Sequence, residues 1–284
     1  MTIKKIGVVG SGAMGTGIAQ ISAQAGYGVI LCDVSEQALQ RAISNIGSSF
    51  EKLIAKGKLT EDAKNETLAR IQTTTDLTAM SKAELVIEAI IEKLEAKNDL
   101  WKQLDGICPA HTIFASNTST MSITKMAAVT ARPEQVAGLH FFNPATVMRL
   151  VEVIRGYYTS DETVATLQEV VRALGKEGIE VKKDTPGFVV NRLMLPQLRE
   201  ACQVYEEGIA SIEDIDKAMT LGLNHPMGPF TLMDYTGIDI AYDSLVYLYS
   251  EFAQPNWAPP AAMKRLISAK RLGKKTGGKG WYSK

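Results

Sequence analysis

Hydrophobic and polar positions at the start of the chain predict a βαβ unit. Residues 3–9 form a β-rich apolar run of the kind that makes a strand buried on both faces. A helical pattern covers about residues 13–25 and ends near Gly26, a residue suited to a helix C-terminus. A second strand is predicted at residues 29–33, so the unit ends on an acidic residue, Asp33.

Apolar runs then alternate with helical patterns over the next 150 or so residues. Ser35 is suited to cap a long helix that reaches about residue 55, and Thr60 begins a shorter one. Further strands are predicted at residues 84–90, 112–115, 136–142, 150–154 and 179–181. Such alternation is typical of an α/β domain with a mainly parallel, doubly wound sheet.

The pattern changes after the last of these strands, and the rest of the chain is helical in character. Thr185 and Pro186 are suited to the N-cap and first residue of a helix, and Pro196 is expected to kink it. We therefore expect an α/β domain over residues 1–184, followed by a smaller all-α domain over residues 185–284.

Composition excludes several classes of function. Hydrophobic residues make up 45% of the chain, and 31 Lys and Arg balance 31 Asp and Glu, so charge favours neither nucleic acid nor a membrane surface as a partner. No apolar run approaches the roughly 18 residues that span a bilayer. Cys32, Cys108 and Cys202 are scattered, which argues against a zinc site and for a reducing compartment. We expect a cytoplasmic protein with no signal segment and no metal.

A glycine-rich stretch, GSGAMG, connects the first predicted strand to the first predicted helix. Its spacing is Gly10-x-Gly12-x-x-Gly15, in which the glycines permit a tight turn, close approach of a pyrophosphate and close helix–strand packing. Asp33, about 20 residues further on, can accept hydrogen bonds from a ribose hydroxyl and would repel a 2′-phosphate. No arginine follows it directly, so the sequence predicts a Rossmann-type fold that binds NAD in preference to NADP.

His140 is the histidine best placed for chemistry. It lies near the carboxyl end of the predicted strand VAGLHFF, at the edge where doubly wound sheets bind ligands. Glu152 lies inside the apolar run LVEVI, where an unpaired carboxylate would be costly. Pairing with His140 would relieve that cost and create an oriented general base. Arg149 or Arg155 could pair with Glu152 instead, and the sequence leaves that alternative open.

Two further polar positions are candidates for a site. Asn117, Thr118 and Ser119 follow a predicted strand in the sequence SNTST, where they could face a ligand or simply cap the next helix. Asn191 lies among apolar neighbours in the first turns of the helix predicted after Pro186, so its amide needs a hydrogen-bond partner.

In combination, these segments resemble the L-3-hydroxyacyl-CoA dehydrogenases, above all their short-chain bacterial type. The resemblance covers nearly the whole chain and rests on the motifs GSGAMGTGIAQ, VIEAIIEKLEAK, FASNTS, GLHFFNP, LVEVIRG, DTPGFVVNRL, SIEDIDKAMTLGLNHPMGPF and LGKKTGGKGWY. It implies interconversion of a short-chain (3S)-3-hydroxyacyl-CoA, such as 3-hydroxybutyryl-CoA, with the 3-ketoacyl-CoA, such as acetoacetyl-CoA, by hydride transfer with NAD(H). It also implies a homodimer formed through the all-α domain. The family usually has a serine where this chain has Thr120.

The same resemblance implies roles for individual residues. His140 would be the catalytic base, oriented by Glu152, while Ser119 and Asn191 would hold the 3-oxygen of the substrate. The expected cofactor contacts are Gly10, Gly12, Ala13, Met14, Gly15, Asp33, Glu92, Lys97, Asn117, Ser119 and Lys275. The expected coenzyme A contacts are Ser49, Lys52 and Lys56, whose spacing would place them on one helical face, although for Lys52 a purely solvated role is an equal alternative.

Two other functions stay open at this point. A related NAD-dependent dehydrogenase of a free sugar acid, such as L-gulonate, would use the same scaffold without needing coenzyme A. A non-catalytic dinucleotide-binding protein would require His140 or Glu152 to be mispaired.

Overall fold

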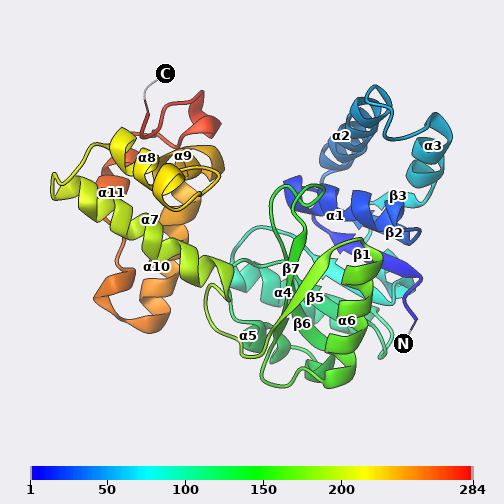
Figure 1. Cartoon of the computed structure of the whole chain (residues 1–284). Helices are drawn as coiled ribbons and strands as arrows, with labels where there is room; N and C mark the ends of the chain where they lie inside the picture. The colour runs from blue at the N-terminus through cyan, green and yellow to red at the C-terminus, as the bar shows by residue number, and fades with distance from the viewer. Residues whose placement is uncertain (1, 283–284) are drawn as a thin grey trace. The chain divides into compact units, whose positions relative to one another are not determined.

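The structure, a computed structural model, describes residues 2–282. The chain divides into two compact units, Met1–Asp184 and Thr185–Lys284. The first unit combines strands and helices, and the described residues of the second are helical apart from turns and one isolated bridge (Figure 1).

In the described residues of the first unit, one eight-stranded sheet has the order β3-β2-β1-β4-β5-β6-β7-β8. The strands are β1 (Lys5–Val9), β2 (Gly28–Cys32), β3 (Ile71–Thr74), β4 (Leu85–Glu88), β5 (Ile113–Ser116), β6 (Val136–Phe141), β7 (Leu150–Arg155) and β8 (Glu177–Val181). Neighbouring strands of this sheet are parallel except for β6 and β7. The predicted mainly parallel, Rossmann-type sheet is therefore confirmed. Its order reverses beside β1, which is where such sheets open a crevice for ligands.

Strand β3 was not predicted from the sequence. Its sequence, IQTT, contains one apolar residue, and none of its four residues is fully buried. It lies at the edge of the sheet, paired only with β2 among the described strands. The apolar run that identifies an interior strand is therefore missing here.

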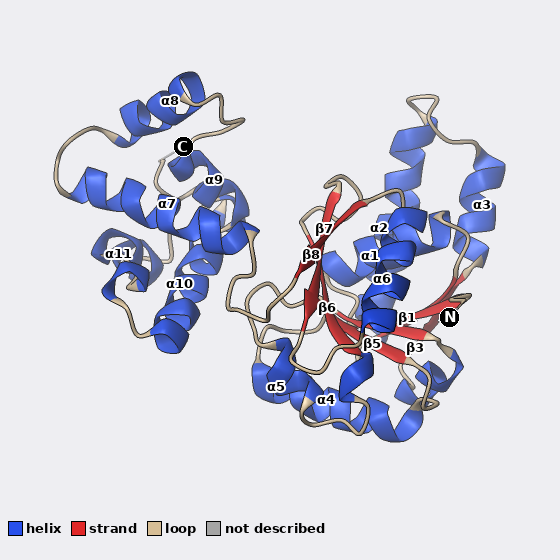
Figure 2. Ribbon diagram, turned by 60° about the horizontal axis from the view of Figure 1, so that its bottom comes forward, coloured by secondary structure: helices blue, strands red, loops and turns tan. Residues whose placement is uncertain are grey.

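Helices cover both faces of the sheet (Figure 2). The α-helices of this unit are α1 (Ala13–Gln24), α2 (Glu36–Ile54), α3 (Glu61–Ala69), α4 (Leu94–Ile107), α5 (Ile123–Ala127) and α6 (Asp161–Ala173). The side chains of Ser35 and Thr60 accept hydrogen bonds from the backbone N–H groups of Ala38 and Ala63, so both predicted N-caps are confirmed. Figure 1 shows α2 and α3 side by side beyond α1.

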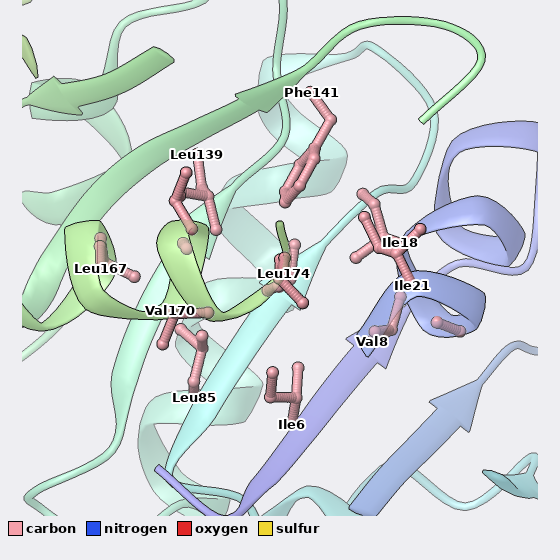
Figure 3. Packing of buried hydrophobic residues seen from close by; sticks show 14 of the residues in the cluster. Ile6, Val8, Ile18, Ile21, Leu85, Leu139, Phe141, Leu167, Val170 and Leu174 are labelled. Carbon is pink, nitrogen blue, oxygen red and sulfur yellow. The ribbon is translucent and has the colours of Figure 1, made fainter. Parts of the chain in front are cut away.

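The core of this unit lies between the sheet and the helices. Ile18 of α1 and Leu167 of α6 belong to the same buried cluster as Val8 and Leu139 of the strands (Figure 3). Burying one such side chain contributes about 1.5–3 kcal/mol, so this layer holds the sheet edge rigidly enough to position a site. Elsewhere in the unit, Trp101 of α4 stacks on Phe114 of β5 with ring centroids 5.0 Å apart.

The second unit is a helical bundle with its own apolar core. Its helices are α7 (Val190–Glu206), α8 (Ile212–Gly222), α9 (Pro229–Thr236), α10 (Ile238–Phe252) and α11 (Ala261–Ser268). Leu198, Phe230, Met233 and Leu245 are among the buried residues of its core. Pro196 lies inside α7, which continues through it. Within residues 2–282, no helix has the length and apolar character needed to cross a bilayer.

The start of α7 corrects the sequence prediction. The helix begins at Val190 and not at Pro186. The backbone N–H of Phe188 donates to the carbonyl of Thr185 at 3.0 Å, and Gly187 has a φ of 77°. Proline followed by a glycine of positive φ is the pattern of a type II turn. Thr185 and Pro186 therefore form a turn before the helix.

Candidate active site

The turn between β1 and α1 is built on two glycines that the fold requires. Gly10 has a φ of 102°, and a Cβ there would lie 2.5 Å from the carbonyl oxygen of Ala89. A Cβ on Gly15 would lie 1.8 Å from the carbonyl oxygen of Gly10. Neither position accepts a side chain without moving backbone, so the turn brings the start of α1 close to β1 and β4.

Gly12 is different, because nothing in the protein fills the space beside it. It has an ordinary φ of −65° as the N-cap residue of α1, and a Cβ there would meet no atom within 4 Å. The fold itself does not demand glycine here. The open space lies at a helix N-terminus, where backbone N–H groups and the helix dipole attract a phosphate. Ala13 is exposed and Met14 is partly buried against the core.

A cavity of about 1160 Å³ extends over this turn. It is lined by the glycine turn, by Asp33 after β2 and by Arg41, Asn45 and Ser49 of α2. Ser49 therefore lies on the same cavity as the predicted cofactor residues. The size and the open glycine face of the cavity fit a dinucleotide.

The other two predicted coenzyme A residues lie apart from this cavity. Lys52 and Lys56 are exposed and do not line it. Because α2 ends at Ile54, Lys56 lies in the turn after the helix. The expectation that Ser49, Lys52 and Lys56 share one helical face is therefore wrong for Lys56.

Asp33 is held as an ionised acceptor at the end of β2. Its carboxylate accepts hydrogen bonds from the backbone N–H and hydroxyl of Ser11, at 2.7 and 2.8 Å, and from the backbone N–H of Ser35 at 3.0 Å. Burial alone would raise the pKa of Asp33, but these bonds and the charge of Arg41 lower that pKa below its ordinary value. Arg41 was missed from the sequence because it lies eight residues beyond Asp33, in the second turn of α2.

His140 and Glu152 form a buried pair across the antiparallel strands β6 and β7. The two residues lie directly opposite each other in the register, and His140 Nδ1 lies 2.7 Å from Glu152 Oε2. Their side chains are 6% and 0% exposed. The two arginines that could have paired with Glu152 have other partners, since Arg149 pairs with Glu177 and Arg155 with Glu180.

The SNTST segment leaves β5 at the same sheet edge. Asn117 Oδ1 accepts the backbone N–H of Phe141, next to His140, at 2.9 Å. Ser119 donates its backbone N–H to Glu92 Oε1 at 2.9 Å and its hydroxyl to the same oxygen at 3.3 Å. This segment is therefore tied both to the end of β6 and to the loop before α4. Thr120, the last residue of the segment, is buried.

Glu92 and Lys97 form part of a charged cluster beneath Ser119. The side chain of Lys97 is 1% exposed, and its ammonium lies 3.1 Å from Glu92 Oε2 and 2.6 Å from Glu88 Oε1. Burial alone would raise the pKa of Glu92, but Lys97 and hydrogen bonds from Thr118 and Ser119 hold that pKa below its ordinary value. The structure thus gives Lys97 two carboxylate partners within the protein itself.

Glu88 is a member of the cluster that the sequence analysis missed. It is fully buried at the end of the apolar strand β4. The signal that identified Glu152, an acidic residue inside an apolar strand, is also present in the sequence LVIE and would have found it.

Two predicted site residues belong to the second unit. Asn191 is half-buried in the first turn of α7. Lys275 is exposed, and its ammonium lies 3.0 Å from a carboxylate oxygen of Asp239. Their contacts to substrate and cofactor stay predictions. Within residues 2–282, no group of three or more His, Cys, Asp and Glu side chains is arranged to hold a metal ion.

Comparison with known proteins places both units in one family. Residues 5–185 match the NAD binding domain of 3-hydroxyacyl-CoA dehydrogenase, and residues 187–284 match its C-terminal domain. The chain is 44% identical over 282 residues to a "Probable 3-hydroxybutyryl-CoA dehydrogenase" of Bacillus subtilis (strain 168), covering 99% of this chain and 98% of that relative. It is 45% identical over 288 residues to the mitochondrial hydroxyacyl-coenzyme A dehydrogenase of Homo sapiens, covering 99% and 91%.

A solved structure agrees with these matches. The crystal structure of (S)-3-hydroxybutyryl-CoA dehydrogenase from Ralstonia eutropha has a TM-score of 0.95 and 46% sequence identity to this chain, covering 100% of both. The resemblance found in the sequence motifs is confirmed. The chain belongs to the 3-hydroxyacyl-CoA dehydrogenase family and is an NAD-dependent oxidoreductase of 3-hydroxyacyl-CoA.

Proposed function

We propose that the protein interconverts short-chain (3S)-3-hydroxyacyl-CoA and 3-ketoacyl-CoA, with 3-hydroxybutyryl-CoA and acetoacetyl-CoA as the substrate pair. The observation that carries this proposal is the buried His140–Glu152 pair at 2.7 Å. It lies at the carboxyl edge of a sheet that also carries an open glycine cradle. The names of the relatives from Bacillus subtilis and Ralstonia eutropha support the four-carbon substrate.

His140 acts as the general base in the direction of oxidation. Glu152 engages Nδ1, so the proton of the substrate's 3-hydroxyl passes to Nε2. The carboxylate of Glu152 fixes the tautomer and stabilises the imidazolium that forms. In the direction of reduction, the same imidazolium returns the proton to the 3-oxygen. NAD supplies the hydride acceptor when it is bound.

Ser119 and Asn191 complete the proposed machinery. Ser119 follows β5, next in the sheet to the strand that carries His140, and its hydroxyl hydrogen-bonds Glu92 at 3.3 Å. A hydroxyl and an amide are suited to hold the 3-oxygen, where negative charge develops as the proton leaves. Asp33, Gly12 and the rest of the glycine turn hold the adenosine and pyrophosphate parts of the cofactor.

The direct test is oxidation of NADH by acetoacetyl-CoA, followed by the absorbance of NADH. We expect turnover with acetoacetyl-CoA and little with free acetoacetate, because the relatives are named for coenzyme A thioesters. A parallel assay with NAD and L-gulonate tests the sugar-acid alternative. NADH binding without turnover of any acyl-CoA would refute the proposal, and efficient use of L-gulonate would replace it.

A homodimer formed through the second unit is part of this proposal. Of the exposed large hydrophobic side chains among the described residues, most lie in this unit, although it is the shorter one. Four of them are each more than 60% exposed: Leu193, Ile209, Leu221 and Leu223. We infer that these side chains contribute to the surface that binds the second copy. The three cysteines are free and buried, which supports a reducing compartment such as the cytoplasm.

A further inference from the structure

We propose that Glu88, a residue outside the reacting groups, is a positioning residue for Ser119. This inference rests on the role that the proposed function gives to Ser119. It concerns how the protein fixes the hydroxyl that holds the substrate's 3-oxygen.

Glu88 is an ionisable side chain at the centre of the sheet. It ends β4, lies opposite Val9 of β1 and Ser116 of β5, and is fully buried. Isolated burial of a carboxylate is costly, so its partners must compensate the lost hydration. Oε1 accepts from Lys97 Nζ at 2.6 Å and from the backbone N–H of Ile90 at 2.8 Å. Oε2 accepts from the hydroxyl of Ser116 at 2.6 Å.

The first connection from Glu88 to Ser119 runs through Lys97. The Lys97 ammonium bridges Glu88 Oε1 and Glu92 Oε2, at 2.6 and 3.1 Å. The other oxygen of Glu92 then accepts both the backbone N–H and the hydroxyl of Ser119. Ser119 is thus linked to strand β4 of the sheet through two carboxylates and one ammonium group.

The second connection runs through Ser116. Its hydroxyl donates to Glu88 Oε2 and accepts the backbone N–H of Thr118 at 3.2 Å. The hydroxyl of Thr118 donates to Glu92 Oε1 at 2.5 Å. The two connections therefore meet at Glu92 and form a closed ring of Glu88, Lys97, Glu92, Thr118 and Ser116, with Ser119 attached to it.

The ring depends on the charge of Glu88. Two carboxylates share one ammonium, and each carboxylate also accepts hydrogen bonds from the SNTST segment or its strand. Glu88→Gln preserves shape but removes the charge, so the bond to Lys97 weakens and Ser116 loses its ionised acceptor. Because a shift of about 1 Å in a positioned group costs up to about a hundredfold in rate, a loosened Ser119 lowers turnover without any change in the reacting residues.

A double-mutant cycle on kcat tests this connection. We expect Glu88→Gln to lower kcat for acetoacetyl-CoA reduction by about tenfold when Ser119 is present, and by less than about twofold in a Ser119→Ala background. Asp105→Asn is the matched control. Asp105 also pairs with a cation, Arg132 at 2.6 Å, but at the opposite end of α4. The kcat of Asp105→Asn should stay within about twofold of that of the wild-type enzyme.

Hydrogen exchange gives a readout that does not depend on activity. Glu88→Gln should speed deuterium uptake in the peptide covering residues 116–121, and Asp105→Asn should not. Ser116→Ala, which opens the ring on its other side, should speed the same uptake and serves if Glu88→Gln does not fold. Equal loss of kcat in both Ser119 backgrounds, or unchanged exchange in both ring variants, would overturn the proposal. If the wild-type enzyme does not reduce acetoacetyl-CoA, the proposed function fails, and exchange alone then decides the role of Glu88.

Discussion

His140 and Glu152 differ from surface ion pairs because water has almost no access to either side chain. Exposed pairs contribute about 0–1 kcal/mol, whereas removing one partner of a buried pair costs about 3–5 kcal/mol. Loss of either partner would therefore disturb the fold as well as the proposed proton transfer. A variant that keeps the shape of each side chain is the suitable probe.

We expect His140→Gln to lower kcat by about 10²–10⁴-fold while NADH affinity changes little, because the base acts in the chemical step. Glu152→Gln should also lower kcat strongly, since an amide does not stabilise the imidazolium. Steady-state kinetics and titration of NADH fluorescence measure the two effects separately. Variants of His140 with nearly full turnover would exclude it as the base.

Asp33 gives a pH-dependent contribution to stability. In the folded protein its pKa is lowered, so between that value and the ordinary value of about 3.9 the folded state binds fewer protons than the unfolded state. Its contribution is complete above the ordinary value and is lost as the pH falls through the lower folded one. We expect the stability advantage of wild type over Asp33→Asn, measured by urea unfolding, to shrink as the pH falls from about 6 to about 3. An advantage that is independent of pH would contradict this.

The three thiols should be unreactive in the folded protein. Burial raises the pKa of Cys32 and of Cys108 to about 11 and that of Cys202 to about 12. At about pH 8, only about one thiol in a thousand is ionised when its pKa is 11, and the thiolate is the reactive form. We expect slow reaction of native protein with a disulfide reagent and rapid reaction of three thiols after unfolding. Fast labelling of any native cysteine would disprove this.

At this scale, the sequence identified a buried charge where it interrupts an apolar strand. An acidic residue inside an apolar strand needs a partner, and this reasoning led to Glu152 and could have led to Glu88. Arg41 could not be found in the same way, because its proximity to Asp33 depends on where α2 lies relative to the end of β2, and the sequence pattern does not show this. Lys97 was named only through the family resemblance, and its burial follows from the placement of α4.

At the scale of elements, Gly12 and Gly15 in the turn between β1 and α1 are glycines for different reasons. Gly15 makes room for protein backbone, and Gly12 makes room for something outside the protein. The glycine spacing alone does not show this difference. The positions of Ala89 and Gly10 around the turn reveal it.

Gly15→Ala should therefore affect mainly stability, and Gly12→Ala mainly NADH binding. We expect Gly15→Ala to lower the free energy of unfolding by about 2–3 kcal/mol, because its methyl group meets a backbone carbonyl. Gly12→Ala should change that free energy by less than about 1 kcal/mol and weaken NADH binding at least about tenfold. Denaturant unfolding and NADH titration of both variants provide the comparison. Equal NADH affinity of Gly12→Ala and wild type would show that the cofactor does not approach this glycine.

Element boundaries were predictable where periodicity and capping agreed. The helices that begin after Ser35 and Thr60 have both signals, and they start where predicted. Pro186 was ambiguous, because proline suits both the first turn of a helix and the second position of a β-turn. The glycine that follows it decides in favour of the turn, since its positive φ is outside the helical region.

At the scale of the whole molecule, the two units differ in how many large apolar side chains they expose, with ten in the second unit and seven in the first among the described residues. Leu221 of α8 is 76% exposed, although its neighbour Ile215 is buried in the core of the second unit. An exposed leucine of this size on a helix that already packs a core by another face is suited to a contact between subunits.

We expect wild-type protein to have twice the 30.9 kDa mass of the chain in light scattering, and Leu221→Asp to weaken the dimer by about 30-fold or more. A carboxylate buried in an apolar interface loses its hydration without a partner. Tyr157→Asp, at an 81% exposed position of the first unit, should leave the mass unchanged and serves as control. A wild-type monomer would refute the dimer.

The antiparallel pair β6–β7 places His140 and Glu152 on one short continuous segment of the chain. Residues 136–155 carry both His140 and Glu152 on one hairpin, whereas the parallel strands of the described sheet are joined by longer crossovers. A contact between residues 12 positions apart closes a small loop at low entropic cost. Transplanting this one hairpin into a related sheet would therefore carry both members of the proposed proton-transfer pair as a single segment. The predicted cofactor contacts do not lie on one such segment, because several strands and the region of α4 contribute to them.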